Sequence, residues 1–591
     1  MLFGRVLEIS TDAPVSAVVT LTGYFDESGH AADGLPQSLA STLASTPRSV
    51  MTTPDGYFFF RELPAGRYSI SAEAFGYLGN TYPLHLIEIT NRDTPTEVPL
   101  RVWKPAAISG RVIDEQGEPV VGVPVTAFRR ETIGSGPKLS GGVANADTDD
   151  RGVYRLAQLP PGNYVVGVLS SSMSLPASLA TAIDGSASNR DESWALTSAL
   201  INGGSQVQSG EGQRVGDFVL RRSGPPPLFS PDGKMLTYAT TLYPGTASPA
   251  DAAVITLESG EARAGIDVPL RFAPTVEVSG VAVGPDGPMN GLTVELQPAN
   301  GLIVNYVVDP IGLPRAITDT SGAFRFLAVS PGSYTLRAAY VVQAPPNSGD
   351  PDVSLWAAQS VSVGDRAING LTVALKAGFH VSGRVGFEGA TESPLAGGQR
   401  LAVGLRPIGS ESWRSLPGRP APDGTFTTAG DGPGRYIVFT SDLQGWTLDS
   451  VSRGGKLAPD DVIELDTSDV RDLIVTFSQK TTRVAGSIAD PNGAPDANAD
   501  VIVFPADTTL WREGIINSRR ARLMHATSAA TFEFSGLAAG EYYIAAVSTR
   551  LVTDWQDPSF LARLIPGATK FTLAAGQSST LTLKTITPRD K

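Results

Sequence analysis

The side chains of this chain that could bind a metal or act as a base are few and widely separated. Its four histidines are His30, His85, His380 and His525. A metal centre or a catalytic triad needs two or more such side chains to converge, and no HExxH or His-x-His spacing occurs. No nucleophile elbow, phosphate-binding loop or dinucleotide fingerprint follows a predicted strand. The sequence therefore predicts that the chain is not an enzyme.

Oxygen ligands stand at alternate positions in one short segment, which makes calcium the metal to consider. Asn145, Asp147 and Asp149 have the spacing of ligands in a looped calcium site. The segment lacks the glycine at the sixth position and the later bidentate glutamate of such loops. Turn formation is the alternative explanation, because Asp and Asn side chains favour turns. Apart from calcium, we expect no cofactor.

Aromatic side chains offer a second kind of site, because a flat ring can stack on the face of a sugar. The candidate ligand-binding residues, which lie before the final strands of their repeat units, are Trp356, Trp446, Trp555, Asp557, Tyr82 and Tyr243. Beside Trp555, the carboxylate of Asp557 could accept hydrogen bonds from sugar hydroxyls. In the alternative interpretation, each ring covers the end of a domain or a seam between two domains.

The charge and the cysteine content of the chain restrict the partners and sites that it could have. The formal net charge is −13, and the densest basic cluster, Arg519, Arg520 and Arg522, is small. Nucleic-acid binding needs a basic face, so we expect no nucleic-acid partner. The chain has no cysteine, which excludes disulfides, thiolate metal sites and a cysteine nucleophile.

Hydropathy gives an expectation about location. No apolar run approaches the roughly 20 residues that cross a bilayer, and Met1 leads straight into a strand-like segment without a signal peptide. We expect an extracellular or cell-surface protein with no membrane insertion, whose leader was removed before this numbering begins.

A repeated phrase sets the elements that must position these side chains. It reads GYFFFRELPAGRY from Gly56 to Tyr68 and GVYRLAQLPPGNY from Gly152 to Tyr164. Further copies begin at Gly322, Gly424 and Ala530. Five copies with one internal spacing predict five tandem copies of a small β-domain. In each copy, we expect the later glycine to adopt a backbone conformation that a β-carbon opposes, and the tyrosine to cap the sandwich with its hydroxyl near water or a carbonyl.

Each copy also has an opening strand with a shared glycine. These glycines are Gly4, Gly110, Gly280, Gly383 and Gly486. About seven short alternating strands per unit predict an all-β fold of five tandem antiparallel β-sandwiches, Ig-like or prealbumin-like. The expected units are residues 1–103, 104–273, 274–377, 378–480 and 481–591. Because the links between units are short, we expect an elongated, semi-rigid rod.

The second unit carries an insertion at about residues 170–241. It combines small polar and proline-rich stretches with a predicted short helix over residues 191–201. Long loops on a rigid scaffold are where function tends to collect. Disorder is the other interpretation of this segment.

The opening strands and the repeated phrase together resemble carboxypeptidase regulatory-like domains. Residues 149–152, Tyr154 and residues 159–164 match the family pattern most closely, and the resemblance extends over nearly the whole chain. It implies a sandwich of transthyretin-like or starch-binding-like type, found in tandem in large secreted and surface proteins of bacteria. The family has no catalytic motif to transfer, and glycan binding is implied only by analogy with relatives on the same fold. In the fifth unit, Ala529 and Ala530 replace the acid-x-Gly of the pattern, which puts the shape of that turn in doubt.

These observations favour a non-enzymatic surface or secreted protein that acts as a spacer and binds a polysaccharide or glycan through the loops of its sandwiches. The alternative is a purely structural rod or an accessory subunit of a cell-envelope assembly, with an envelope protein as its partner. A third hypothesis is an enzyme whose site lies in the insertion, near Asp184, Asp191 and Glu192. Exposed tryptophans would favour the first hypothesis, and tryptophans buried at seams the second.

Overall fold

The computed structural model describes most of the chain. The described residues are 1–24, 47–64, 66–79, 85–89, 95–133, 136–185, 212–222, 227–299, 313–342, 353–390, 392–408, 416–441, 443, 445–480, 482–511, 519–527, 529–548 and 555–587. Strands dominate these residues, so the prediction of an all-β chain is confirmed. The expected helix at residues 191–201 lies outside the described residues.

Unit one illustrates how the strands of a unit form two sheets around one core. Its first sheet contains β1 (Leu2–Glu8), β4 (Tyr57–Phe60), β7 (Thr96–Glu97) and β8 (Leu100–Val102), and its second contains β2 (Val18–Tyr24), β3 (Arg48–Met51), β5 (Gly66–Glu73) and β6 (His85–Ile89). Alternate residues of β1 are buried, as expected for a strand with one face on a core. A cluster of buried apolar side chains from both sheets forms that core.

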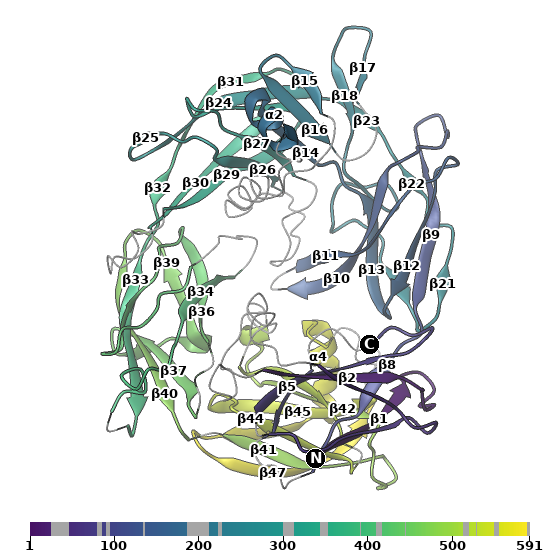
Figure 1. The fold of residues 1–591 in the computed structure, drawn as a ribbon, viewed down its shortest axis with the longest axis vertical. Coiled ribbons are helices and arrows are strands. Elements are labelled where there is room, and N and C mark those ends of the chain that lie inside the picture. Colours follow the sequence, from purple (N-terminus) through teal and green to yellow (C-terminus); the bar gives the residue numbers. More distant parts are fainter. Residues whose placement is uncertain are drawn as a thin grey trace.

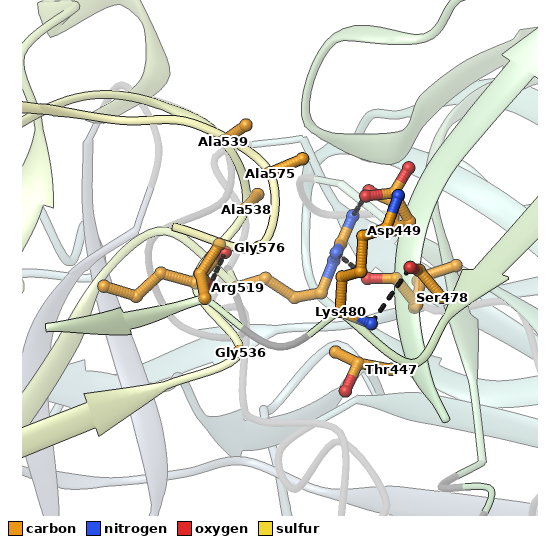
Figure 2. Close-up of a pocket in the computed structure, with 13 residues that line it drawn as sticks. Thr447, Asp449, Ser478, Lys480, Arg519, Gly536, Ala538, Ala539, Ala575 and Gly576 are labelled. Atoms are coloured by element: carbon orange, nitrogen blue, oxygen red, sulfur yellow. Dashed lines mark hydrogen bonds between the residues drawn. The ribbon is translucent and has the colours of Figure 1, made fainter. Parts of the chain in front are cut away.

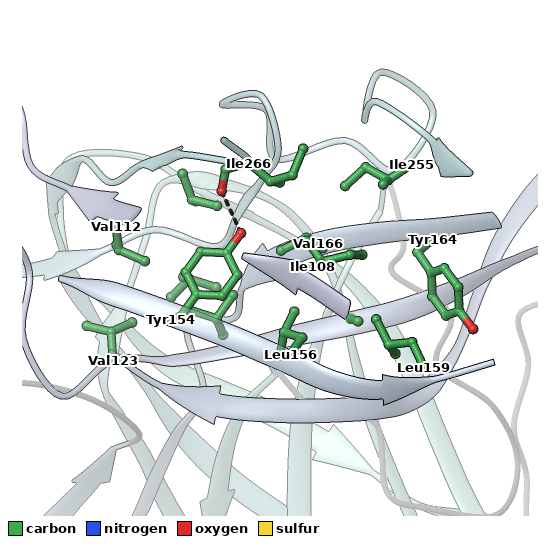
Figure 3. Packing of buried hydrophobic residues seen from close by; sticks show 14 of the residues in the cluster. Ile108, Val112, Val123, Tyr154, Leu156, Leu159, Tyr164, Val166, Ile255 and Ile266 are labelled. Atoms are coloured by element: carbon green, nitrogen blue, oxygen red, sulfur yellow. Dashed lines mark hydrogen bonds between the residues drawn. The ribbon is translucent and has the colours of Figure 1, made fainter. Parts of the chain in front are cut away.

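Units two and three repeat the plan. The strands of unit two are β9 (Ala106–Ile113), β10 (Pro124–Ile133), β11 (Gly136–Asp147), β12 (Val153–Leu159), β13 (Gly162–Val168), β19 (Thr241–Leu242), β20 (Ile255–Leu257), β21 (Ala262–Arg263) and β22 (Val268–Pro269). The strands of unit three are β24 (Val276–Gly284), β25 (Gly287–Pro288), β26 (Thr293–Pro298), β27 (Pro314–Ile317), β28 (Ala323–Val329), β29 (Gly332–Val342), β30 (Val353–Val363), β31 (Ile368–Ala374) and β32 (Lys376–Ala377). Each unit encloses its own core cluster, and Figure 3 shows that of unit two.

Units four and five follow. The elements of unit four are β33 (Val381–Glu388), β34 (Val403–Pro407), β35 (Thr425–Thr427), β36 (Gly434–Thr440), β37 (Thr447–Arg453), β38 (Lys456–Leu457), η2 (Pro459–Asp461), β39 (Val462–Leu465) and β40 (Val470–Ser478). The elements of unit five are β41 (Arg483–Ala489), β42 (Ala499–Pro505), η3 (Thr508–Trp511), β43 (Arg522–His525), β44 (Thr531–Ser535), β45 (Gly540–Ser548), α4 (Pro558–Leu564), η6 (Ile565–Gly567), β46 (Thr569–Leu573) and β47 (Ser578–Ile586). Their cores are again separate clusters.

The sandwiches differ from the expected antiparallel plan in a parallel pairing that recurs in every unit. In every unit the opening strand pairs in parallel with a closing strand, as β1 does with β8 and β33 with β40. The opening glycine makes this approach possible. A β-carbon on Gly383 would lie 1.9 Å from the carbonyl oxygen of Leu473, and equivalent close contacts occur at Gly4, Gly110, Gly280 and Gly486. Only a residue without a side chain fits at this position.

The tyrosines that end the five copies of the repeated phrase cap their sandwiches, and each makes the same hydrogen bond. Each hydroxyl donates to the carbonyl oxygen four residues earlier, at 2.5–2.8 Å, in the pairs Tyr68–Pro64, Tyr164–Pro160, Tyr334–Ser330, Tyr436–Gly432 and Tyr542–Ala538. The prediction of a tyrosine cap that reaches a carbonyl is therefore confirmed.

The glycine two residues before each tyrosine follows the prediction in part. The positive φ is confirmed at Gly162, Gly434 and Gly540, whereas the prediction is wrong at Gly332, for which no such φ occurs. The fifth unit keeps the turn that was in doubt. Ala530 adopts φ 54°, the left-handed conformation that glycine has in the other units, and its amide donates to the Thr527 carbonyl at 2.8 Å.

The insertion of unit two becomes part of unit three. It forms β14 (Ser172–Pro176), α2 (Ala177–Gly185), β15 (Gln213–Val215), β16 (Phe218–Arg222), β17 (Leu228–Phe229) and β18 (Met235–Tyr238), and β18 pairs with β23 (Phe272–Pro274). β14 pairs in parallel with β27, so β14, β15 and β16 extend the unit-three sheet to eight strands. The described part of the insertion is therefore ordered secondary structure that joins two units.

The units do not form the elongated rod that we expected. In Figure 1 the chain turns in one direction from unit to unit, and unit one (purple) returns to the side of unit five (yellow). Arg101 of unit one donates hydrogen bonds to Asn498 and His525 of unit five. The expectation of an elongated rod is corrected to a ring-like arrangement, because contacts at each seam fix the direction in which the chain turns.

Candidate functional site

Two of the predicted stacking residues lie against their own cores. The indole of Trp446 forms a T-shaped pair with the ring of Phe387, with ring centroids 5.1 Å apart, beside the unit-four core. Trp555 is half-buried against the unit-five core that includes Phe504 and Phe560. Asp557, which was expected to bind a sugar beside Trp555, accepts the amide of Ser559 at 2.7 Å and caps helix α4.

The other predicted aromatics do not gather either. Trp356 lies half-buried on β30, two residues from Ser354, whose amide donates to the Ala429 carbonyl of unit four at 2.8 Å. Tyr243 packs against the unit-two core, and Tyr82 lies outside the described residues. The described rings thus lie in different units, at core edges and near a seam.

The predicted calcium ligands lie along a strand and the turn that follows it. Asn145 accepts a hydrogen bond from the Thr126 hydroxyl at 2.7 Å, and Asp147 is exposed at the end of β11. Asp149 accepts the amides of Val153 at 2.7 Å and Arg151 at 3.0 Å. The Val153 amide, above all, lowers the pKa of the Asp149 carboxyl. Among the described residues, no group of three or more His, Asp or Glu side chains gathers to hold a metal.

The described histidine rings serve separate structural contacts. Nδ1 of His380 lies 2.8 Å from the Thr428 carbonyl oxygen within unit four. His525 lies in unit five, with Nδ1 2.7 Å from Asp500 Oδ1. His30 lies outside the described residues, as do Asp191 and Glu192 of the proposed enzyme site, and Asp184 pairs with Arg221 at 2.6 Å.

Side-chain contacts that do converge lie instead at the seams between units. Between units four and five, Arg519 donates through Nε and one Nη to both carboxylate oxygens of Asp461, at 2.9–3.1 Å. It also donates to the carbonyls of Leu448 and Asp449, and Figure 2 shows this crossing between the two units. Arg520 pairs with Asp460 at 2.6 Å. Burial raises the pKa of the Asp460 carboxyl, and Arg520 opposes that rise.

A small hollow beside this clamp is open to solvent. Its lining comes from both units and includes Thr447, Lys480, Arg519 and Gly576 (Figure 2). Lys480 is paired with Glu388 at 3.1 Å, and Arg519 is engaged in the clamp. The hollow therefore follows from the way the two units meet.

Units two and three meet through strand pairing and apolar contacts. Besides the pairing of β14 with β27, the Ser174 hydroxyl accepts the Leu327 amide at 3.0 Å. Phe218 and Leu220 of the insertion form an apolar cluster with Leu327 and Ala328 of unit three. Backbone pairing and apolar burial together fix the angle between these units.

Sequence reasoning missed these seams, although some signals were present. The cluster Arg519, Arg520 and Arg522 was considered only as a basic patch. In the structure Arg519 and Arg520 pair with Asp461 and Asp460, which are neighbours in the previous unit. Asp557 followed by Pro558 is a typical start of a helix, and it predicts α4.

Residues 107–190 match the carboxypeptidase regulatory-like domain family. This segment, which begins on β9 and includes α2, is therefore a carboxypeptidase regulatory-like domain. The match covers only part of unit two, so for the other units the assignment stays a prediction. Comparison with curated proteins gave no match.

Solved structures with distant similarity include bacterial pilins. The minor pilin of Streptococcus agalactiae is 13% identical, with 46% of this chain and 96% of the pilin covered and a TM-score of 0.22. The full-length RrgB pilus protein of Streptococcus pneumoniae is 10% identical, with 100% of this chain and 98% of RrgB covered and a TM-score of 0.13. A protein of Pseudomonas aeruginosa that was suggested to bind carbohydrate is 16% identical, with 17% and 88% covered and a TM-score of 0.14. Each likeness concerns the fold alone. Within the described residues, no helix has the length and apolar character needed to cross a membrane.

Proposed function

We propose that this chain is a non-enzymatic scaffold of the cell surface or the extracellular space, which holds five β-sandwiches in fixed relative positions. The observation that supports it best is the chemistry of the seams. The eight-stranded sheet joins units two and three, and the Arg519–Asp461 clamp joins units four and five. The surface location rests on the resemblance to domains of secreted bacterial proteins.

Glycan binding by Trp356, Trp446 or Trp555 stays a prediction. The packing of Trp446 on Phe387 and of Trp555 on its core supports the alternative, in which these rings stabilise their units.

Two measurements test the scaffold. Small-angle scattering at neutral pH should fit one arrangement of the five units, and an ensemble of units on flexible links would contradict the proposal. A pull-down on insoluble polysaccharides, with and without EDTA, should show no retention. Retention that is lost in Trp446→Ala or Trp555→Ala would establish the glycan-binding role instead. Retention that is lost only with EDTA would support calcium at Asn145, Asp147 and Asp149.

A further inference from the structure

The contact between units one and five closes the ring without any chain link between them. Its centre is Arg101, whose side chain is only 11% exposed. The guanidinium bonds to Asp12 Oδ1 of its own unit at 2.5 Å and to two groups of unit five, Asn498 Oδ1 at 2.6 Å and His525 Nε2 at 3.3 Å. One buried cation thus connects the two ends of the ring.

This geometry requires a neutral His525. A guanidinium can only donate hydrogen bonds, so Nε2 of His525 must carry a lone pair that accepts from Nε of Arg101. The imidazole proton then lies on Nδ1, where it is donated to Asp500 Oδ1 at 2.7 Å. His525 and Asp500 are themselves 17% and 8% exposed, so water does little to weaken these contacts.

We propose that the unit-one/unit-five seam is an acid-sensitive latch, in which protonation of His525 releases Arg101 and opens the ring. A proton on Nε2 would face the N–H of Arg101, so the hydrogen bond is lost and two positive charges meet. When the seam opens, each cation keeps its own carboxylate, Asp12 for Arg101 and Asp500 for His525. The open form therefore takes up a proton more readily than the closed form, and acid favours opening.

Histidine is the side chain whose ordinary pKa lies between about 5 and 8, and the other charged groups described around this seam are arginines and carboxylates. Asp500 comes from β42, Arg101 from β8 and Asp12 from the turn after β1. Asp496, before β42, accepts the Thr585 hydroxyl at 2.5 Å. Arg522, on the same strand as His525, donates to the Ser535 and Gly536 carbonyls. Carboxylates ordinarily titrate near pH 4, well below this range.

The latch can be followed by fluorescence energy transfer in the full chain. The protein has no cysteine, so Met51→Cys in unit one and Ser578→Cys in unit five, both at exposed positions, give two unique labelling sites. Between pH 7.5 and pH 5.5 we expect transfer between the labels to change and the radius of gyration to increase. Both changes should be independent of protein concentration, since opening is a rearrangement within one molecule.

Variants separate the latch from general acid effects. His525→Gln can accept from Arg101 and donate to Asp500 at every pH, so it should stay closed at pH 5.5. His525→Lys should be open at both values. Arg101→Gln, on the other side of the seam, should remove most of the pH-dependent change. Unchanged circular dichroism at both pH values would show that the units remain folded. The proposal is overturned if the parent shows no change, or if His525→Gln opens as the parent does.

Discussion

The hydroxyl of Tyr164 donates to the carbonyl oxygen of Pro160 at 2.6 Å, and the tyrosine ring is fully buried. Figure 3 shows the ring at the edge of the unit-two core with its hydroxyl directed away from the centre. The same bond, between the same two positions, occurs in all five units. It links the turn within the repeated phrase to the strand that follows, so one side chain fixes both the turn and the core.

Removal of this hydroxyl should destabilise unit two. In Tyr164→Phe the ring still fills the core, but the Pro160 carbonyl loses its donor, which should cost about 1–2 kcal/mol. Denaturant unfolding of the chain, followed by a probe in unit two, measures the change. Tyr243→Phe, at the half-buried edge of the same core, is the control and should cost less. Equal losses in the two variants would contradict a special role for the Tyr164 hydroxyl.

Two glycines on one strand give a matched test of the parallel pairing. In Gly383→Ala the new β-carbon would lie 1.9 Å from the Leu473 carbonyl oxygen, so β33 and β40 must separate. We expect a loss of about 3 kcal/mol, the upper range for overpacking. In Gly386→Ala, on the same strand, nothing lies within 4 Å of the new carbon, and stability should change by less than about 0.5 kcal/mol. Thermal unfolding of unit four compares the two, and similar melting temperatures would disprove the close approach.

The clamp between units four and five should show measurable coupling. The side chains of Arg519 and Asp461 are 21% and 13% exposed, so their ion pair is better shielded than a surface pair. A double-mutant cycle of Arg519→Ala and Asp461→Ala should give a coupling free energy of about 1–3 kcal/mol. The coupling free energy is measured by denaturation of the four proteins, monitored in both units. Additive losses would mean that the two side chains stabilise their units independently.

The Asp149 turn should make stability depend on pH in acid. Because the Val153 amide lowers the pKa of Asp149 in the folded chain, its contribution is present above the unfolded-state pKa and disappears as pH falls through the folded-state value. Asp149→Asn should therefore be less stable than the parent at pH 7, and the difference should shrink as the pH falls below about 4, the ordinary range of an aspartate. Unfolding curves at several pH values test this. Asp150→Asn, one residue further, is the control, and a pH profile altered equally by both substitutions would refute the assignment.

The repeat phrases predict the five sandwiches and their tyrosine caps because these depend on residues close in sequence. Tyr542 and Ala538 lie within one turn, and any copy of the phrase brings them together. The parallel pairing of the first and last strands was not predicted. Gly383 occupies the position of close approach, but a single glycine in a strand does not indicate which carbonyl group lies against it.

The ring and its seams could not be predicted for a different reason. Arg101 and His525 belong to opposite ends of the chain, and either is typical of a solvated surface when considered alone. The strands of the insertion, such as Ser172–Pro176, are short and buried on a neighbouring unit, so they show no alternating pattern. Contacts between units depend on relative orientation, which no local pattern records.

The parallel pairing of each opening strand with its closing strand has a mechanical consequence. Because β33 and β40 run in the same direction, the chain enters unit four at one end of the pair and leaves it at the other. A pulling force along the chain would therefore slide the two strands past each other and load all their hydrogen bonds at once, whereas a hairpin would unzip one bond at a time. Under tension, the ring should open at the latch while its sandwiches stay intact.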